Sequence, residues 1–180
     1  MAYRALYLFV EGDDDERFAR NVISPRLSKR YDWIGTVQYA QKKAVKVSAH
    51  LRNIKAMGAE YFFLADINSS PCFPEKRQDL LNKFTDLEGA RVIIVVKEIE
   101  GWYLAGVPAN NPWGIRVPAD TSNLTKEQFD VAMAKPFDSR IAYMVEILKL
   151  FDVDTAGARN PSFQYFARRC GLLEVRGADR

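Results

Sequence analysis

Residues 6–10, with the sequence LYLFV, form a continuous apolar run that is followed directly by residues 11–16, EGDDDE. An uninterrupted run of β-forming residues is typical of a strand that is buried on both faces, as in a parallel sheet. The acidic residues that follow are typical of a helix start, with Asp13 as the cap and Glu16 three residues later. The helix is expected to end before Pro25 or to bend there. This stretch therefore predicts a strand that leads at once into a helix.

The alternation of strand and helix continues to about residue 100. Further strands are expected at 36–40, 61–65 and 92–96, and further helices at 44–57 and 75–84. Gly58 follows the first of these helices, in the place of a C-cap. Strands separated by helical crossovers pair in parallel, with the helices on both faces of the sheet. We therefore expect an α/β fold with a mostly parallel four-stranded sheet flanked by helices.

The pattern changes after Gly101. Asparagine, proline and glycine residues make a turn-rich stretch at 110–118, and helical segments are expected at 126–134, 139–151 and 162–170. Trp102 and Tyr103 are expected to pack in the core rather than to stack on bases. We expect a single domain over 1–180, made of an α/β core at 1–106 and a helical part at 107–180 packed on it.

Composition excludes several classes of protein. A chain of 180 residues with 48% hydrophobic and 27% charged residues is typical of an ordinary globular domain. Cys72 and Cys170 have no CxxC spacing, and with the single His50 they leave no zinc site. We find no signal-peptide pattern, no apolar run of the roughly 18 residues that a membrane span needs, and no glycine-rich nucleotide loop. We therefore expect a cytoplasmic protein without a membrane partner.

Acidic or amide residues follow three of the predicted strands. They are Glu11, then Asp66 with Asn68, then Glu98 with Glu100. Ligands bind at the carboxyl ends of the strands in an open parallel sheet, where all of these residues are expected to lie. If the chain stays extended through Glu100, then Glu98 and Glu100 point to the same side. The alternative is that each acid only caps the helix after it.

Clustered carboxylates need a counter-charge. Two of them about 4 Å apart repel by roughly 4 kcal/mol at an effective dielectric constant near 20. A shared proton or a divalent cation relieves this repulsion, and ligands that are all oxygen favour Mg²⁺ or Mn²⁺ over zinc. The sequence thus predicts a magnesium or manganese site. Its ligands would be Glu11, Asp66, Asn68, Glu98 and Glu100.

Basic residues are concentrated between Trp33 and Ala59, a segment with no acidic residue. In a helix, Lys42, Lys43 and Lys46 share one side, and they are the candidates for binding a nucleic-acid backbone. A solvated helix face is the alternative. The formal net charge of +3 permits a polyanionic partner without requiring one.

Two motifs resemble those of the topoisomerase-primase (TOPRIM) proteins: the VEG of residues 10–12, followed by Asp15, and the Asp-x-Asn of residues 66–68. Two more, the EIEGWYL of residues 98–104 and the PSFQYF of residues 161–166, resemble motifs of a narrower group. The sequence is most similar to a bacterial domain-of-unknown-function family of TOPRIM-like proteins. That family is related to the nuclease part of the overcoming-lysogenization-defect proteins and to phage-defence genes.

This resemblance implies a Mg²⁺-dependent phosphodiesterase, a nuclease or a nucleic-acid-processing component of a bacterial defence system. It implies catalytic roles for Glu11 as general base or metal-contacting acid, for Asp66 as the principal metal ligand and for Glu100 as the third acid, beside Glu98. DNA or RNA is the implied partner, and a protein encoded nearby could be a second one. Asn68 stands where the family has an aspartate, so one negative charge is missing.

Two other functions are consistent with the sequence. A receiver-like phosphoacceptor module would use Asp13 or Asp14, Asp66 as the acceptor, and Lys97. A catalytically silent TOPRIM-like binding protein would have lost activity through Asn68.

Overall fold

The computed structural model describes residues 3–133 and 135–174, and the chain divides into two compact units, Met1–Val95 and Val96–Arg180. The predicted α/β class is confirmed: the first unit holds a four-stranded parallel sheet flanked by helices, and the second is helical. The division falls before residue 106, the predicted end of the core, because helix α5 (Glu100–Ala105) packs with the helices that follow it. The expectation of a single domain remains a prediction.

The sheet of the first unit is parallel throughout, with strand order β2-β1-β3-β4. In β1 (Ala5–Val10) the register places Phe9 between Val37 and Phe63. The other strands are β2 (Trp33–Gln38), β3 (Glu60–Asp66) and β4 (Val92–Val95). All four strands were predicted from the sequence, and β2 begins earlier than expected because Trp33 and Ile34 pair with Ala5 and Leu6.

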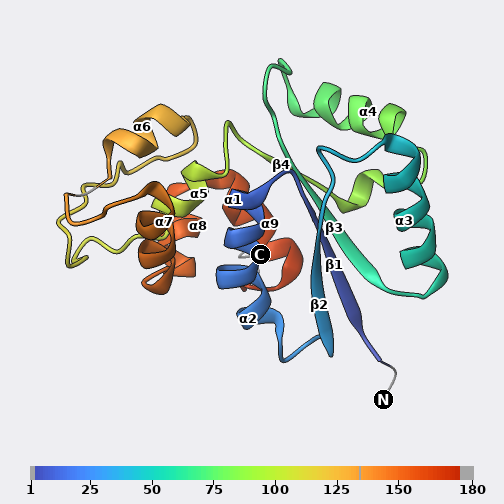
Figure 1. The fold of residues 1–180 in the computed structure, drawn as a ribbon, viewed down its shortest axis with the longest axis horizontal. Helices are drawn as coiled ribbons and strands as arrows, with labels where there is room; N and C mark the ends of the chain where they lie inside the picture. Colours follow the sequence, from blue (N-terminus) through green and yellow to red (C-terminus); the bar gives the residue numbers. More distant parts are fainter. Residues whose placement is uncertain (1–2, 134, 175–180) are drawn as a thin grey trace, which may run out of the picture. The chain divides into compact units, whose positions relative to one another are not determined.

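Helices cover both faces of this sheet (Figure 1). α3 (Ala44–Ala56) and α4 (Phe73–Lys83) lie on one face, over a core of aromatic and aliphatic side chains from β1, β3 and β4. α1 (Asp13–Phe18) and α2 (Ser24–Leu27) lie on the other face. α3 ends at Ala56, one residue before its predicted end; Met57 is the C-cap, and Gly58 follows it with a φ of 66°.

The first helix differs from its prediction at both ends. Gly12, not Asp13, is the N-cap residue, and its backbone N–H donates to Asp15 Oδ2 at 3.3 Å. The helix does not end before Pro25, because a π-helical turn, Ala19–Ile23, connects α1 to α2. Proline lacks the backbone N–H of an ordinary helical residue, so one helical hydrogen bond is missing. The wider π-helical turn before Pro25 accommodates the missing bond.

The second unit contains helices at the three predicted positions; the first two are shorter than predicted, and the third begins one residue earlier. They are α6 (Lys126–Val131), α7 (Arg140–Lys149) and α9 (Pro161–Cys170). Ala134, the predicted end of the first of these, lies outside the described residues. α5 and α8 (Val153–Arg159) were not predicted. Among residues 3–133 and 135–174, no helix has the length and hydropathy needed to cross a membrane.

Trp102 packs in the core of the second unit, as predicted. Its side chain is fully buried and its ring stacks on Phe166, with the centroids 5.3 Å apart. Its indole N–H donates to Ser162 Oγ at 2.8 Å, and that hydroxyl donates to Asn160 Oδ1 at 2.8 Å. The EIEGWYL and PSFQYF segments, which the sequence suggested as motifs, are therefore joined by a buried hydrogen bond.

We expect the Ser162→Ala substitution to lower the free energy of unfolding by about 1–3 kcal/mol, because it leaves a buried indole N–H without its acceptor. Urea denaturation followed by tryptophan fluorescence measures this loss. Ser28→Ala, which removes an exposed serine hydroxyl, is the matched control and should change the free energy by less than about 0.5 kcal/mol. Equal losses in the two variants would contradict the structural role of Ser162.

Candidate functional site

Two of the predicted site residues meet at the carboxyl edge of the sheet. β1 and β3 are adjacent parallel strands, so Glu11, which follows β1, lies beside Asp66, the last residue of β3. The backbone N–H of Asp66 donates to Glu11 Oε1 at 3.1 Å. Both side chains are partly exposed. This edge of the first unit is the candidate site.

Tyr39 contributes a hydroxyl to the same edge. It follows β2, and its hydroxyl lies 3.1 Å from Glu11 Oε1 and 3.0 Å from the carbonyl oxygen of Leu64. Burial raises the pKa of Tyr39, and the negative charges of Glu11, Asp15 and Asp66 raise it further. The hydroxyl therefore remains a neutral donor surrounded by three carboxylates. The sequence analysis missed Tyr39, although the rule that selected the acids, a position just after a parallel strand, also selects it.

Asp15 is the third carboxylate near this hydroxyl. It is buried, and it accepts the N–H of Gly12 at the start of α1. Its place in the 11–16 run predicts a helix start, and it follows the VEG motif of the resemblance, but it has no separate role in the predicted site.

The other acids of the 11–16 run are engaged with neighbouring side chains. Gln38 Nε2 donates to Asp13 Oδ1 at 2.8 Å, and Arg17 pairs with Asp14 at 2.5 Å. The hydroxyl of Thr36 holds the pKa of Glu16 below its usual value, with help from Gln38 and Arg20. The contacts of Asp13 and Glu16 with Gln38 and Thr36 join α1 to β2, whereas the pair of Asp14 and Arg17 lies within α1.

Asn68 lies in the loop after β3 and is exposed. Its backbone is left-handed, with a φ of 51°, a conformation that asparagine adopts more readily than most residues. Its side-chain amide donates to the carbonyl oxygen of Asp66 at 3.4 Å. The amide carbonyl is the group with which it could coordinate a cation.

Glu98 and Glu100 belong to the second unit, and the expected extended conformation does not reach them. The strand ends at Val95, Lys97 has a φ of 58°, and α5 begins at Glu100. The condition under which Glu98 and Glu100 would point to the same side, a chain extended through Glu100, is therefore not met. Glu98 accepts the backbone N–H of Lys126, the first residue of α6.

Glu100 has a cationic partner inside its own unit. It is 5% exposed, and the guanidinium of Arg140 forms an ion pair with it while donating from Nε to Asp130 Oδ1 at 2.8 Å. Arg140 was not selected from the sequence, because no local pattern connects it to a carboxylate 40 residues earlier. In this arrangement the charge of Glu100 is balanced by a protein side chain.

The donors at the first unit's carboxyl edge fit one mode of magnesium binding. Within residues 3–133 and 135–174, no group of three or more His, Cys, Asp or Glu side chains has the spacing of a metal site. Mg²⁺ is commonly bound by only one or two carboxylates, together with waters and substrate phosphates. Glu11 and Asp66 supply such a pair. Glu11 Oε2 accepts no hydrogen bond from the described residues, which leaves it available to a cation.

The three lysines that were predicted to bind nucleic acid lie at the start of α3, beside the same edge of the sheet. Lys43 caps α3, Lys42 precedes it and Lys46 lies in its first turn, and all three are exposed. The backbone N–H of Lys42 donates to the carbonyl oxygen of Tyr39 at 3.0 Å, so one loop carries both the lysines and the tyrosine. In the described part of the chain no acidic side chain pairs with them, whereas Arg52 pairs with Asp86.

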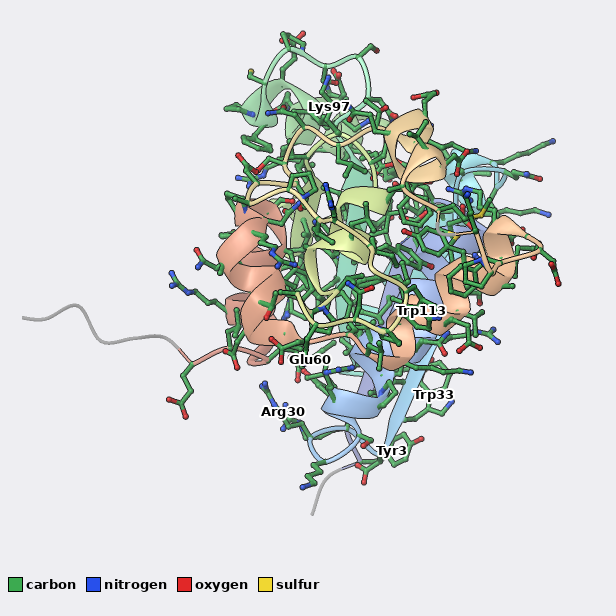
Figure 2. All side chains as sticks on the ribbon, turned by 90° about the vertical axis from the view of Figure 1, so that its left-hand side faces the viewer. Tyr3, Arg30, Trp33, Glu60, Lys97 and Trp113 are labelled. Carbon is green, nitrogen blue, oxygen red and sulfur yellow. The ribbon has the colours of Figure 1, made fainter. Side chains whose placement is uncertain are left out.

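A different surface occupies the opposite edge of the sheet. Tyr3 and Trp33 lie together there (Figure 2), and with Tyr7 and Met57 they line a pocket of about 240 Å³. Trp33 begins β2, so this pocket is at the amino-terminal edge, one strand length away from Glu11. The hollow and the carboxylates of the first unit are therefore separate features.

We expect Arg140→Met to lower the free energy of unfolding by about 3 kcal/mol or more, because it leaves the buried carboxylate of Glu100 without its cation. The double variant Glu100→Gln/Arg140→Met should recover part of this loss, as urea denaturation would measure. Lys149→Met, which removes an exposed partner of Glu146, is the control and should cost less than about 1 kcal/mol. A loss no larger than that of the control would contradict the assignment of Arg140 as the partner of Glu100.

Comparison with protein-family models, with curated proteins and with solved structures gives no match to this chain.

Proposed function

We propose that this protein is a Mg²⁺- or Mn²⁺-dependent phosphodiesterase of the TOPRIM-like type that acts on nucleic acid. The observation that supports it best is the meeting of Glu11 and Asp66 at the carboxyl edge of two adjacent parallel strands. Open α/β sheets bind ligands at this edge. The resemblance of the motifs adds a role as a nuclease in a bacterial defence system.

In this proposal, Glu11 and Asp66 hold the cation through carboxylate oxygens, and Asn68 can add its amide carbonyl. When bound, the cation supplies a Lewis acid that stabilises charge on the phosphate and activates water. Glu11 orients or deprotonates the attacking nucleophile. Because Asn68 lacks the charge of an aspartate, the cation is held by fewer negative groups. The site should therefore bind it best in the presence of phosphate oxygens.

Lys42, Lys43 and Lys46 hold the substrate backbone. They project from the loop and first turn that begin beside Tyr39, so a strand of nucleic acid bound to them passes the carboxylate pair. Lysines neutralise phosphates and release condensed counterions, which gives affinity without base selectivity. This supports a nucleic acid as the substrate class and leaves DNA and RNA equivalent.

A cytoplasmic location is part of the proposal. Cys72 and Cys170 are both free thiols, one exposed and one buried, as in a reducing compartment.

The receiver-like alternative is less well supported. In a receiver, an acid after the first strand shares a site with the acceptor aspartate, which here would be Asp66. Asp13 and Asp14 instead contact Gln38 and Arg17. Acetyl phosphate should leave Asp66 unmodified in mass spectrometry, and a stoichiometric adduct there would favour the receiver.

We expect Glu11→Gln and Asp66→Asn each to lower the rate of nucleic-acid cleavage about a hundredfold or more, because each removes a charged oxygen ligand or base. Cleavage of labelled single- and double-stranded DNA and RNA in Mn²⁺ measures the effect. Asp13→Asn is the control, since Asp13 contacts Gln38 and not Asp66, and it should retain the rate. Full activity in both site variants would end the proposal. Nucleic-acid binding without turnover would instead favour the silent binding protein.

We expect the triple variant Lys42→Gln/Lys43→Gln/Lys46→Gln to bind nucleic acid more weakly and to flatten the salt dependence. Each lost phosphate contact lowers the slope of log K against log salt by about 0.7–0.9. Fluorescence anisotropy at several salt concentrations measures the slope. The triple variant Arg26→Gln/Lys29→Gln/Arg30→Gln removes the same charge from α2 and the turn that follows it, at the opposite edge. A loss of equal size in that control would show that net charge alone drives binding.

A further inference from the structure

Glu11 is held by one of its two carboxylate oxygens. The hydroxyl of Tyr39 and the backbone N–H of Asp66 both lie 3.1 Å from Oε1. Oε2 accepts no hydrogen bond from residues 3–133 or 135–174. We propose that Tyr39 is a positioning residue: it holds Oε1 so that Oε2 is directed toward the cation and phosphate. This inference rests on the proposed function.

Two donors on one oxygen restrict the rotation of a glutamate side chain. A glutamate at a strand end has three rotatable bonds, and a single hydrogen bond leaves much of that freedom. A donor from the end of β3 and a second from the segment after β2 approach Oε1 from the two strands that flank β1. The carboxylate is thereby oriented before any ligand binds, which lowers the entropy cost of binding.

Tyr39 is rigid enough to serve this purpose. It is 5% exposed, and its ring lies against Phe63, with centroids 4.2 Å apart, and edge-on to Phe84 at 5.9 Å. Its backbone N–H donates to the carbonyl oxygen of Val10 at 3.0 Å, directly before Glu11. Both ends of the tyrosine are therefore fixed, one to the core and the other to β1.

The hydroxyl also lies 3.0 Å from the carbonyl oxygen of Leu64, which is a second acceptor. A phenolic hydroxyl has one hydrogen, so it can donate fully to only one of these two acceptors. The carboxylate is the stronger acceptor, because hydrogen bonds to charged oxygens are stronger than those to neutral ones. The hydrogen is therefore directed at Glu11.

Glu11 and Glu100, two acids of the predicted site, have opposite kinds of partner. Glu100 is paired with the guanidinium of Arg140, which neutralises it. Glu11 is held by a phenol and a backbone amide, both of which are neutral donors. Neutral donors orient the carboxylate and leave its negative charge unbalanced, so it can attract a cation. This contrast is what distinguishes a ligand-binding carboxylate from a structural one here.

The test is the Mn²⁺ affinity of the Tyr39→Phe chain, measured by isothermal titration calorimetry without nucleic acid. We expect it to be about tenfold weaker or more than that of the unmodified chain, the usual effect of removing a group that orients a metal ligand. Tyr61→Phe is the matched control. Tyr61 belongs to the same core cluster and its hydroxyl accepts the N–H of Glu88 at 3.0 Å, away from Glu11. Its Mn²⁺ affinity should be unchanged.

Urea denaturation of both variants separates affinity from stability. Each variant loses one hydroxyl from a buried ring, so the free energy of unfolding of each should fall by about 1 kcal/mol. Unchanged Mn²⁺ affinity in Tyr39→Phe, combined with lost affinity in Glu11→Gln, would overturn the positioning role and leave the proposed function standing. Equal weakening in Tyr61→Phe would also overturn it. If the unmodified chain neither binds Mn²⁺ nor cleaves nucleic acid, both the proposed function and this inference are wrong.

Discussion

The parallel pairing of β1 with β2 on one side and β3 on the other is the constraint on which the candidate site depends. Parallel neighbours end at the same edge, so the residues that follow them are brought together although they lie far apart in the chain. Glu11, Tyr39 and Asp66 are such residues, each from the end of one strand. An antiparallel arrangement of the same strands would separate them by the length of a strand. The strand topology thus brings the site residues together, and their side chains then determine the chemistry of the site.

The environment of each acid decides what it can do. The run at 11–16 supplies five carboxylates, and those of Asp13, Asp14 and Glu16 contact side chains on α1 or β2. These acids stabilise the way the helix packs on the sheet. Glu11 differs because it lies one residue before the helix cap, at the strand end, where its neighbours are neutral donors. Two positions in the chain therefore separate the candidate ligand Glu11 from the structural acid Asp13.

Much of the fold could be predicted because the hydrophobic pattern is local. The strands and the crossover helices follow from runs of apolar residues and from Gly58, and the burial of Trp102 follows from its type. The predictions that are wrong concern positions where two local interactions compete. Asp13 satisfies the statistics of an N-cap, yet Gly12 occupies the cap because Asp15 can reach its N–H. Pro25 is compatible with a continued helix because a π-helical turn precedes it.

The class of the fold, the order of its strands and helices, and the acids at the ends of β1 and β3 could all be found from the sequence alone. The periodicity of apolar residues and the residues at strand ends are properties of short segments, so no tertiary structure is needed to find them. The partner of each acid, in contrast, could be found only from the folded chain. The hydroxyl of Tyr39 reaches Glu11 across 28 positions of the chain, and Arg140 reaches Glu100 across 40. Such contacts depend on strand pairing and helix packing, which no local pattern records.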